Sequence, residues 1–122
     1  MDVRDEHHII SERGFRQLRA VRTRLLIPLP IVFEVYKHVA YLVNVQTAYR
    51  AFEYMPTSFE ILYLDSGDVV TVQEMIVRMP WWGGSLEDAT LAMVALQRDV
   101  PLWTFNYRDL TAFPNLEFWS PG

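Results

Sequence analysis

The chain has 122 residues, a formal net charge of −4 and no cysteine, and 51% of its residues are hydrophobic. This length matches one domain, residues 1–122, that buries a core without a metal or disulfide to stabilise it. The missing cysteines exclude disulfides and thiolate sites, and the negative charge argues against nonspecific coating of nucleic acid. The longest apolar run, residues 25–33, contains two prolines and is too short to span a bilayer. We therefore expect a cytoplasmic protein without membrane contact.

Apolar periodicity and Pro, Gly and Ser positions predict helices that alternate with short strands. The predicted helices cover residues 5–22, a stretch that begins at Pro30, residues 45–55 before Pro56, residues 69–79 before Pro80, and a stretch that begins at Ser85. The predicted strands cover residues 25–27, 59–64, 101–105 and 116–119. This alternation indicates an α/β domain with a mainly parallel sheet.

The helical spacing also predicts which side chains face the core. In the first helix, Gly14 would permit close packing against a neighbouring element. The core positions expected in the second and fourth helices are Ile31, Val35, Val39, Leu42, Val69, Val72, Ile76 and Met79. We expect Trp81 and Trp82 to pack a loop against the core rather than to stack on bases.

Polar side chains follow the predicted strand at residues 101–105. Because ligands bind at the carboxyl ends of parallel strands, Thr104, Asn106 and Asp109 could converge there with Asp88 at the start of the last helix. Oxygen ligands of this kind suit a hard divalent cation. Glu34 stands out as well, because it is a carboxylate among apolar neighbours on a predicted helix.

Asp88 and Glu34 also have a purely structural interpretation. Ser85 and Asp88 have the spacing of a capping box, which would explain Asp88 without any chemistry. Glu34 could form an intrahelical pair with His38, one turn later, and Tyr41 lies on the same side. The arginines that are concentrated in the first fifth of the chain could form a solvated helix face or contact nucleic acid.

Taken together, these segments resemble the PIN-domain family of metal-dependent ribonucleases, and in particular the VapC-type toxins. The resemblance covers nearly the whole chain and is carried by four segments. They are Arg4-Asp-Glu-His-His8, Leu25-Leu-Ile-Pro-Leu-Pro-Ile-Val-Phe-Glu34, Asp88-Ala-Thr-Leu-Ala and Thr104-Phe-Asn-Tyr-Arg-Asp109-Leu. The last segment is similar to the family's Thr-x-Asn-x-x-Asp-Phe signature.

The resemblance implies a three-layer α/β/α PIN-like domain that hydrolyses RNA phosphodiesters as the toxin of a toxin–antitoxin pair. It implies Mg²⁺ or Mn²⁺ bound by Glu34 and Asp88, with Asn106 or Asp109 completing the site. Thr104 would orient a water or a neighbouring carboxylate. A homodimer and a protein antitoxin are implied as partners, and the apolar candidates for the dimer surface are Phe52, Tyr54, Met55 and Trp119.

In the family, a strand that carries the first acid precedes the segment matched by residues 4–8. Residues 1–3 are too short to form that strand, so we expect the first strand and first acid to be missing or replaced. Residues upstream, another segment or another subunit could supply them, or the chain could be an inactive relative.

Three hypotheses follow for the function. The leading one is an endoribonuclease with a PIN-type fold. The second is a noncatalytic PIN-like module that binds protein or RNA. The third is an unrelated α/β domain, which a large separation between Glu34 and Asp88 would support.

Overall fold

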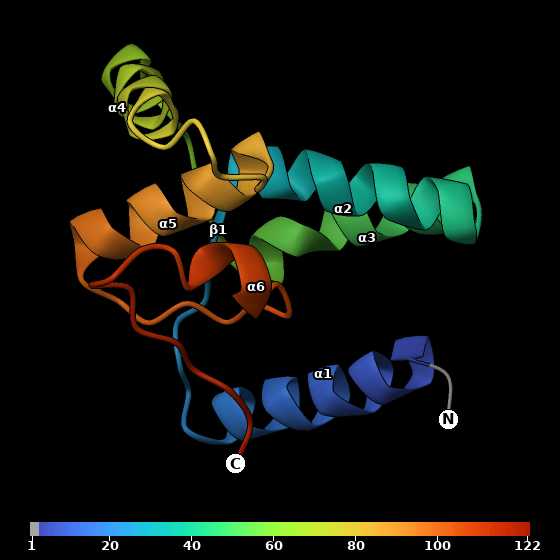
Figure 1. The fold of residues 1–122 in the computed structure, drawn as a ribbon. Helices are drawn as coiled ribbons and strands as arrows, with labels where there is room; N and C mark the ends of the chain where they lie inside the picture. Colours follow the sequence, from blue (N-terminus) through green and yellow to red (C-terminus); the bar gives the residue numbers. More distant parts are fainter. Residues whose placement is uncertain (1–2) are drawn as a thin grey trace.

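The computed structural model describes the backbone of residues 3–122 and the side chains from Ile9 onward, and helices make up most of it (Figure 1). Its elements are α1 (Val3–Ala20), β1 (Leu26–Pro28), α2 (Leu29–Leu42), α3 (Val45–Ser58), β2 (Glu60–Leu62), α4 (Ser66–Val77), α5 (Leu86–Arg98) and α6 (Tyr107–Leu110). The side chains of the predicted family segment at residues 4–8 lie outside the described part. No helix in that part is both long and apolar enough to cross a membrane.

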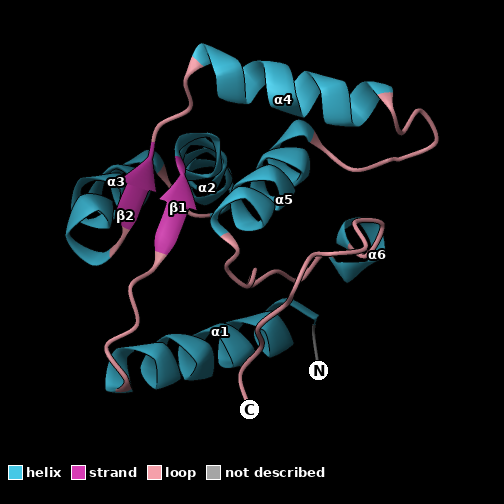
Figure 2. Ribbon diagram, turned by 90° about the vertical axis from the view of Figure 1, so that its left-hand side faces the viewer, coloured by secondary structure: helices cyan, strands magenta, loops and turns pink. Residues whose placement is uncertain are grey.

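The sheet consists of β1 and β2, which pair in parallel with Ile27 opposite Ile61 (Figure 2). The mixed α/β class with parallel pairing is therefore confirmed. The two predicted C-terminal strands are wrong as strands, because they reduce to one parallel bridge between Leu102 and Phe118. Pro101 lacks an N–H and cannot extend this ladder. Among residues 3–122, no strand joins the bridge to β1.

Helix α5 lies at the centre of the core and packs against β1, α2, α4 and α6 (Figure 2). Both clusters of buried apolar side chains include residues of this helix. Its buried residues are Ala89, Thr90, Ala92, Met93, Val94 and Ala95. The small alanines let neighbouring elements approach closely, which fixes the direction in which the start of α5 points.

Side-chain caps set the starts of three helices. Asn44 accepts a hydrogen bond from the Thr47 N–H at 2.7 Å, and capping boxes open α4 and α5. The predicted end of the third helix at Pro56 is wrong, because α3 continues to Ser58. So close to the C-terminal end of a helix, the missing N–H of proline removes only one intrahelical hydrogen bond.

Several predicted burial positions are wrong. Leu42 and Val69 are 55% and 47% exposed, and the predicted packing of Trp81 fails because its side chain is 70% exposed. In α2 the most deeply buried side chain is Val32, so the core face is rotated from the predicted one. Met55, expected on a dimer surface, is buried in the core.

The predicted close approach at Gly14 is confirmed. A Cβ at this buried position would lie 2.5 Å from two ring atoms of Trp103 and 2.9 Å from Cγ of Pro121. The Trp103 ring also stands edge-on to Phe15 and Trp119, with centroids 4.9 and 5.1 Å away. Helix α1 is therefore held against the C-terminal segment by an aromatic cluster that only glycine accommodates.

Replacing Gly14 with alanine is expected to destabilise the fold by about 1–3 kcal/mol, because the added methyl group overpacks the Trp103 contact. Urea unfolding measures this change, and Arg13→Ala on the exposed face of α1 is the control. On an uncrowded helix, the same Gly→Ala change would instead stabilise by about 1 kcal/mol. A gain of that size would show that α1 does not pack on Trp103.

Candidate functional site

The start of α5 carries the first carboxylate of the candidate site. The Ser85 hydroxyl accepts a hydrogen bond from the Asp88 N–H at 3.1 Å, and Asp88 Oδ2 accepts one from the Ser85 N–H at 3.3 Å. The predicted capping box is therefore confirmed. It fixes the Asp88 side chain at the positive end of the helix, where a negative charge is favoured.

The same Asp88 oxygen also faces α6. Asn106 Nδ2 donates to Asp88 Oδ2 at 2.9 Å and to Asp109 Oδ2 at 3.0 Å. Because both acceptors are carboxylates, the nitrogen of the Asn106 amide must face them, and its oxygen points elsewhere. Two carboxylates from different helices are thus held together by one neutral donor. This arrangement brings together Asp88, Asn106 and Asp109 as the sequence predicted.

Thr104 acts on the site through the backbone of Asn106. Its hydroxyl accepts a hydrogen bond from the Asn106 N–H at 3.0 Å. This local hydrogen bond stabilises the turn that leads into α6. Thr104 therefore positions the amide that joins the two carboxylates.

Trp82 supports Asp109 and was not recognised from the sequence as part of the site. Its indole N–H donates to the Asp109 carbonyl at 2.7 Å, and its ring stands edge-on to Phe113 at a centroid distance of 5.4 Å. The sequence gives one signal for this contact, because the N–H of a partly buried indole needs a hydrogen-bond acceptor. Arg108 lies 3.6 Å from the Asp109 carboxylate, but its side chain is 88% exposed and neutralises Asp109 only weakly.

Glu34 on α2 faces the acidic start of α5. Its pKa is raised above 4.5 by partial burial and then by the negative charges of Glu87 and Asp88, while His38 and Lys37 oppose the rise. The expected Glu34–His38 pair is not formed, because no salt bridge or hydrogen bond joins them among the described side chains. Glu34 and Asp88 are close enough to repel each other, which argues against the hypothesis of an unrelated domain.

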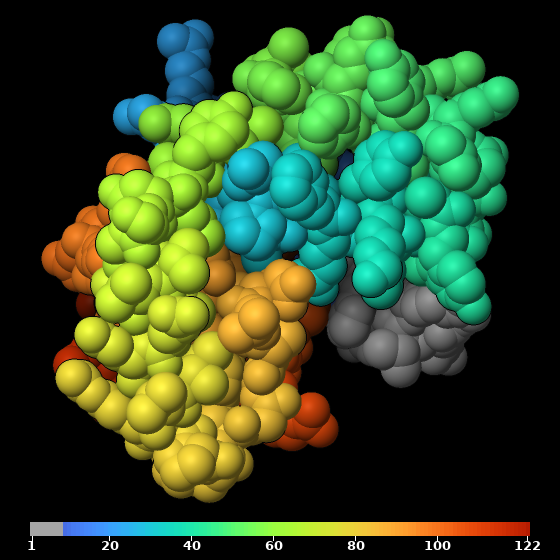
Figure 3. Space-filling model, turned by 90° about the horizontal axis from the view of Figure 1, so that it is seen from above, coloured from blue at the N-terminus to red at the C-terminus, as the bar shows by residue number. Residues whose placement is uncertain are grey.

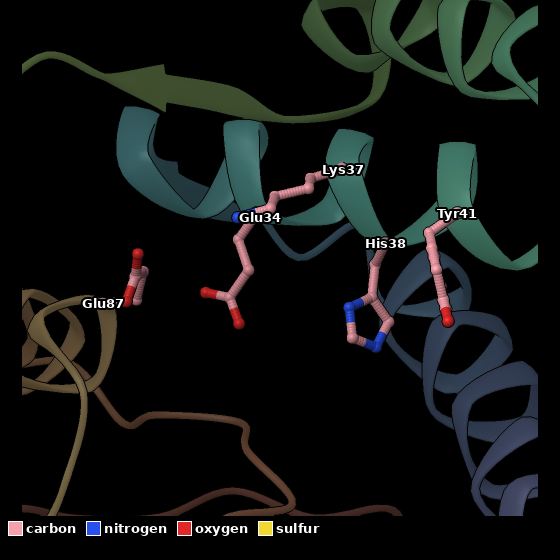
Figure 4. A pocket seen from close by; sticks show the side chains of 5 residues that line it. All are labelled: Glu34, Lys37, His38, Tyr41 and Glu87. Carbon is pink, nitrogen blue, oxygen red and sulfur yellow. The ribbon is translucent and has the colours of Figure 1, made fainter.

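A pocket of about 450 Å³ lies between α2 and the start of α5. Its lining residues are Glu34, Lys37, His38, Tyr41 and Glu87. Figure 4 shows the Glu34 and Glu87 carboxylates directed into the same space, with the His38 and Tyr41 rings further along the same face of α2. Seen from above, the side chains of α2 lie beside those of the start of α5 (Figure 3). Glu87 was missed because Asp88 alone had the spacing of a cap.

The candidate site thus combines two carboxylates that accept from the same Asn106 amide with two further acids, Glu34 and Glu87, that line the pocket. Within the part of the chain whose side chains are described, no three His, Cys, Asp or Glu residues form a metal-binding group. The arrangement is therefore strongly acidic, and its described hydrogen-bond donors are mostly neutral.

Comparison with solved structures gives a clear match. The chain is similar to a chain of VapBC-1 from nontypeable Haemophilus influenzae, with a TM-score of 0.65 and 18% sequence identity over 80% of this chain and 75% of that one. VapBC-1 is a PIN-domain toxin–antitoxin structure. The chain has a PIN-domain fold. No protein-family model matches it, and no curated protein does either.

The raised pKa of Glu34 gives a prediction for the candidate site. A carboxyl group whose pKa is higher in the folded state contributes stability below the unfolded pKa, and this contribution is lost as the pH rises. Without divalent cations, Glu34→Gln should therefore increase the free energy of unfolding at pH 7 but not at pH 4. We expect less than about 1 kcal/mol, because Glu34 is only partly buried and solvent screens its charge.

Urea unfolding at the two pH values, with chelator present, measures this difference. Glu53→Gln, on the exposed face of α3, is the matched control and should show no such pH-dependent gain. An equal effect of Glu34→Gln at pH 4 and pH 7 would contradict the repulsion between α2 and α5.

Proposed function

We propose that this chain is a divalent-metal-dependent endoribonuclease of the VapC toxin type. The observation that carries the proposal is the pair of hydrogen bonds from Asn106 to Asp88 and Asp109. Asp88 and Asp109 come from different helices and converge in a PIN-like fold, and the negative charge of Asp88 also acts on Glu34. Convergence of carboxylates without a strong cationic partner is typical of a site for a hard cation.

The donor set fits Mg²⁺ or Mn²⁺. In proteins Mg²⁺ is usually bound by one or two carboxylates and completes its shell with water and substrate phosphates, so three ligands at contact distance are not required. We assign Asp88 and Asp109 as ligands and Glu34 as the third acid. Asn106 directs its side-chain nitrogen at both carboxylates, so in this geometry it positions the ligands. Its side-chain oxygen would bind the cation only after the amide group rotates by about 180°.

In the proposed reaction, the protein holds its acids in place and the RNA strand lies along the pocket. When bound, the cation supplies a polarised phosphate, an activated water and neutralisation of the leaving oxygen. Asp88 is held by the capping box, and Asp109 is held by Asn106 and Trp82. Lys37, beside Glu34 in the pocket, is placed to attract the phosphate backbone.

The match to VapBC-1 supports a protein antitoxin as partner, and we propose a homodimer as well. Among the apolar candidates for the dimer surface, Phe52 and Tyr54 are 40% and 67% exposed and remain candidates. Met55 is buried, and Trp119 is half-buried against Trp103, so both serve the fold.

A second candidate function is a noncatalytic PIN-like module that binds protein or RNA. The observation that favours it is that the described side chains form no group of three metal-ligating residues. The two functions differ in whether the protein cleaves RNA with these acids or only binds protein or RNA.

The nuclease function predicts that purified protein cleaves single-stranded RNA in the presence of Mn²⁺ and that chelator abolishes the cleavage. Asp88→Asn should lower the rate by more than about 100-fold, the upper end of the loss when a partner of a metal ligand is removed. Glu34→Ala should also strongly lower it. Gel-resolved cleavage of a labelled RNA measures both rates.

Asp68→Asn is the matched control for Asp88→Asn. Asp68 occupies the same position in the capping box of α4, where its Oδ2 accepts from the Asp65 N–H at 3.0 Å, but it lies outside the site. The Asp68→Asn variant tests the loss of a helix cap alone, and we expect its rate of RNA cleavage to stay close to that of wild type. Activity that survives both Asp88→Asn and Glu34→Ala would overturn the proposed function and point to a contaminating nuclease.

A further inference from the structure

The pocket continues from the carboxylates along one face of α2. Lys37, His38 and Tyr41 follow Glu34 by three, four and seven residues, so all four start from the same side of the helix. Figure 4 shows the Glu34, His38 and Tyr41 side chains leaving α2 in the same direction, while the Lys37 side chain runs back along the helix toward Glu34. The phosphate-attracting amine of Lys37 therefore lies on the Glu34 side of the face, and the Tyr41 ring lies at its other end.

Tyr41 is the most unusual residue of this face. Its side chain is 88% exposed, although an aromatic ring gains free energy when it is buried. In the described structure it takes part in no ring-to-ring contact, whereas Tyr36 on the same helix stands edge-on to Phe52 at 5.9 Å. A solvated ring beside a cationic segment is typical of a stacking platform for nucleic-acid bases.

The dimensions of the face fit a short stretch of RNA. Seven residues of α-helix rise about 10 Å, the length of about three stacked nucleotides. A strand whose phosphate lies at Glu34 and Asp88 would therefore bring one of its next bases to Tyr41. His38 lies between Glu34 and Tyr41, and the Lys37 side chain extends toward the Glu34 end (Figure 4).

Resting on the nuclease function above, we propose that the Lys37–His38–Tyr41 face of α2 binds the single-stranded RNA that flanks the cleaved phosphate. Tyr41 stacks on a base, and Lys37 contacts a backbone phosphate. A protein partner would instead cover Tyr41 together with the apolar residues at the tip of the α2–α3 hairpin. Leu42 is the nearest of these and is 55% exposed.

Binding is tested without cleavage, with the full chain in chelator and a fluorescently labelled single-stranded oligoadenylate. Fluorescence anisotropy should show that Tyr41→Ala weakens binding about tenfold, the scale of one lost base stack. Tyr41→Phe retains the ring and should bind within about twofold of wild type. Lys37→Ala should reduce the slope of log affinity against log salt by about 0.7, the value for one phosphate contact on a single strand.

Leu42→Ala is the matched control, because its side chain points about 100° away from that of Tyr41 on the same helix. It should leave RNA affinity unchanged, as should Tyr63→Ala, an exposed tyrosine outside the pocket. Circular dichroism checks that each variant folds. An unchanged affinity in Tyr41→Ala, or no measurable binding by wild type, would overturn the proposal.

Sedimentation of the same variants tests the alternative that a protein partner, rather than RNA, covers this face of α2. If Tyr41→Ala and Leu42→Ala both change the oligomeric state and neither changes RNA affinity, the face is a protein interface and the proposal is wrong. Failure here is distinct from failure of the nuclease function. If the protein cleaves RNA but Tyr41→Ala leaves its RNA affinity unchanged, only the RNA-binding face is refuted. If Tyr41→Ala weakens RNA binding but the protein never cleaves RNA, only the nuclease function is refuted.

Discussion

The candidate site depends on one side-chain amide. Asn106 donates to Asp88 and Asp109 at 2.9 and 3.0 Å and thereby holds carboxylates from α5 and α6 side by side. Like charges at this separation repel each other, and a neutral donor offsets only part of that repulsion. Thr104, Trp82 and the Ser85–Asp88 capping box hold Asn106 and its two partners in place, and Glu34 adds negative charge beside them.

The fold supports this arrangement from three directions. Thr104 fixes the backbone of Asn106, Trp82 holds the carbonyl of Asp109, and the capping box fixes Asp88. Helix α5 is buried along most of its length, so its start cannot move away from the opposing acids without disturbing the core. The protein thus keeps in place an acidic cluster that a well-solvated chain would spread apart, which is the physical reason to expect a cation there.

Local signals in the sequence predicted the parts of this structure that local physics determines. The Ser85–Asp88 capping box, the close approach at Gly14 and the helix after Pro28 depend on residues a few positions apart or on a single residue type. Glu34 was singled out because a carboxylate among apolar residues needs a partner. Asn106 and Asp109 were singled out because they follow a predicted strand, and the resemblance to PIN domains selected the same residues. The fold agrees with that resemblance.

The remaining features depend on packing between distant segments, which one sequence does not encode locally. Trp81 and Trp82 are adjacent and chemically identical, yet only Trp82 reaches the Asp109 carbonyl, while Trp81 is 70% exposed. Glu87 joins the pocket because of how α5 is oriented relative to α2. The core face of α2 was misplaced because a helix with apolar residues on several sides gives no unique direction for burial.

The proposed cation site is the cluster around Asn106, and NMR tests it without any cleavage assay. Substoichiometric Mn²⁺ added to ¹⁵N-labelled protein broadens the amide NMR signals of residues close to the bound ion. We expect selective broadening at Asp88, Asn106 and Asp109, and at Glu34 on the facing helix. Broadening centred instead on the Asp65–Asp68 cap of α4, or uniform weak broadening over the whole chain, would show that the cluster does not bind the ion.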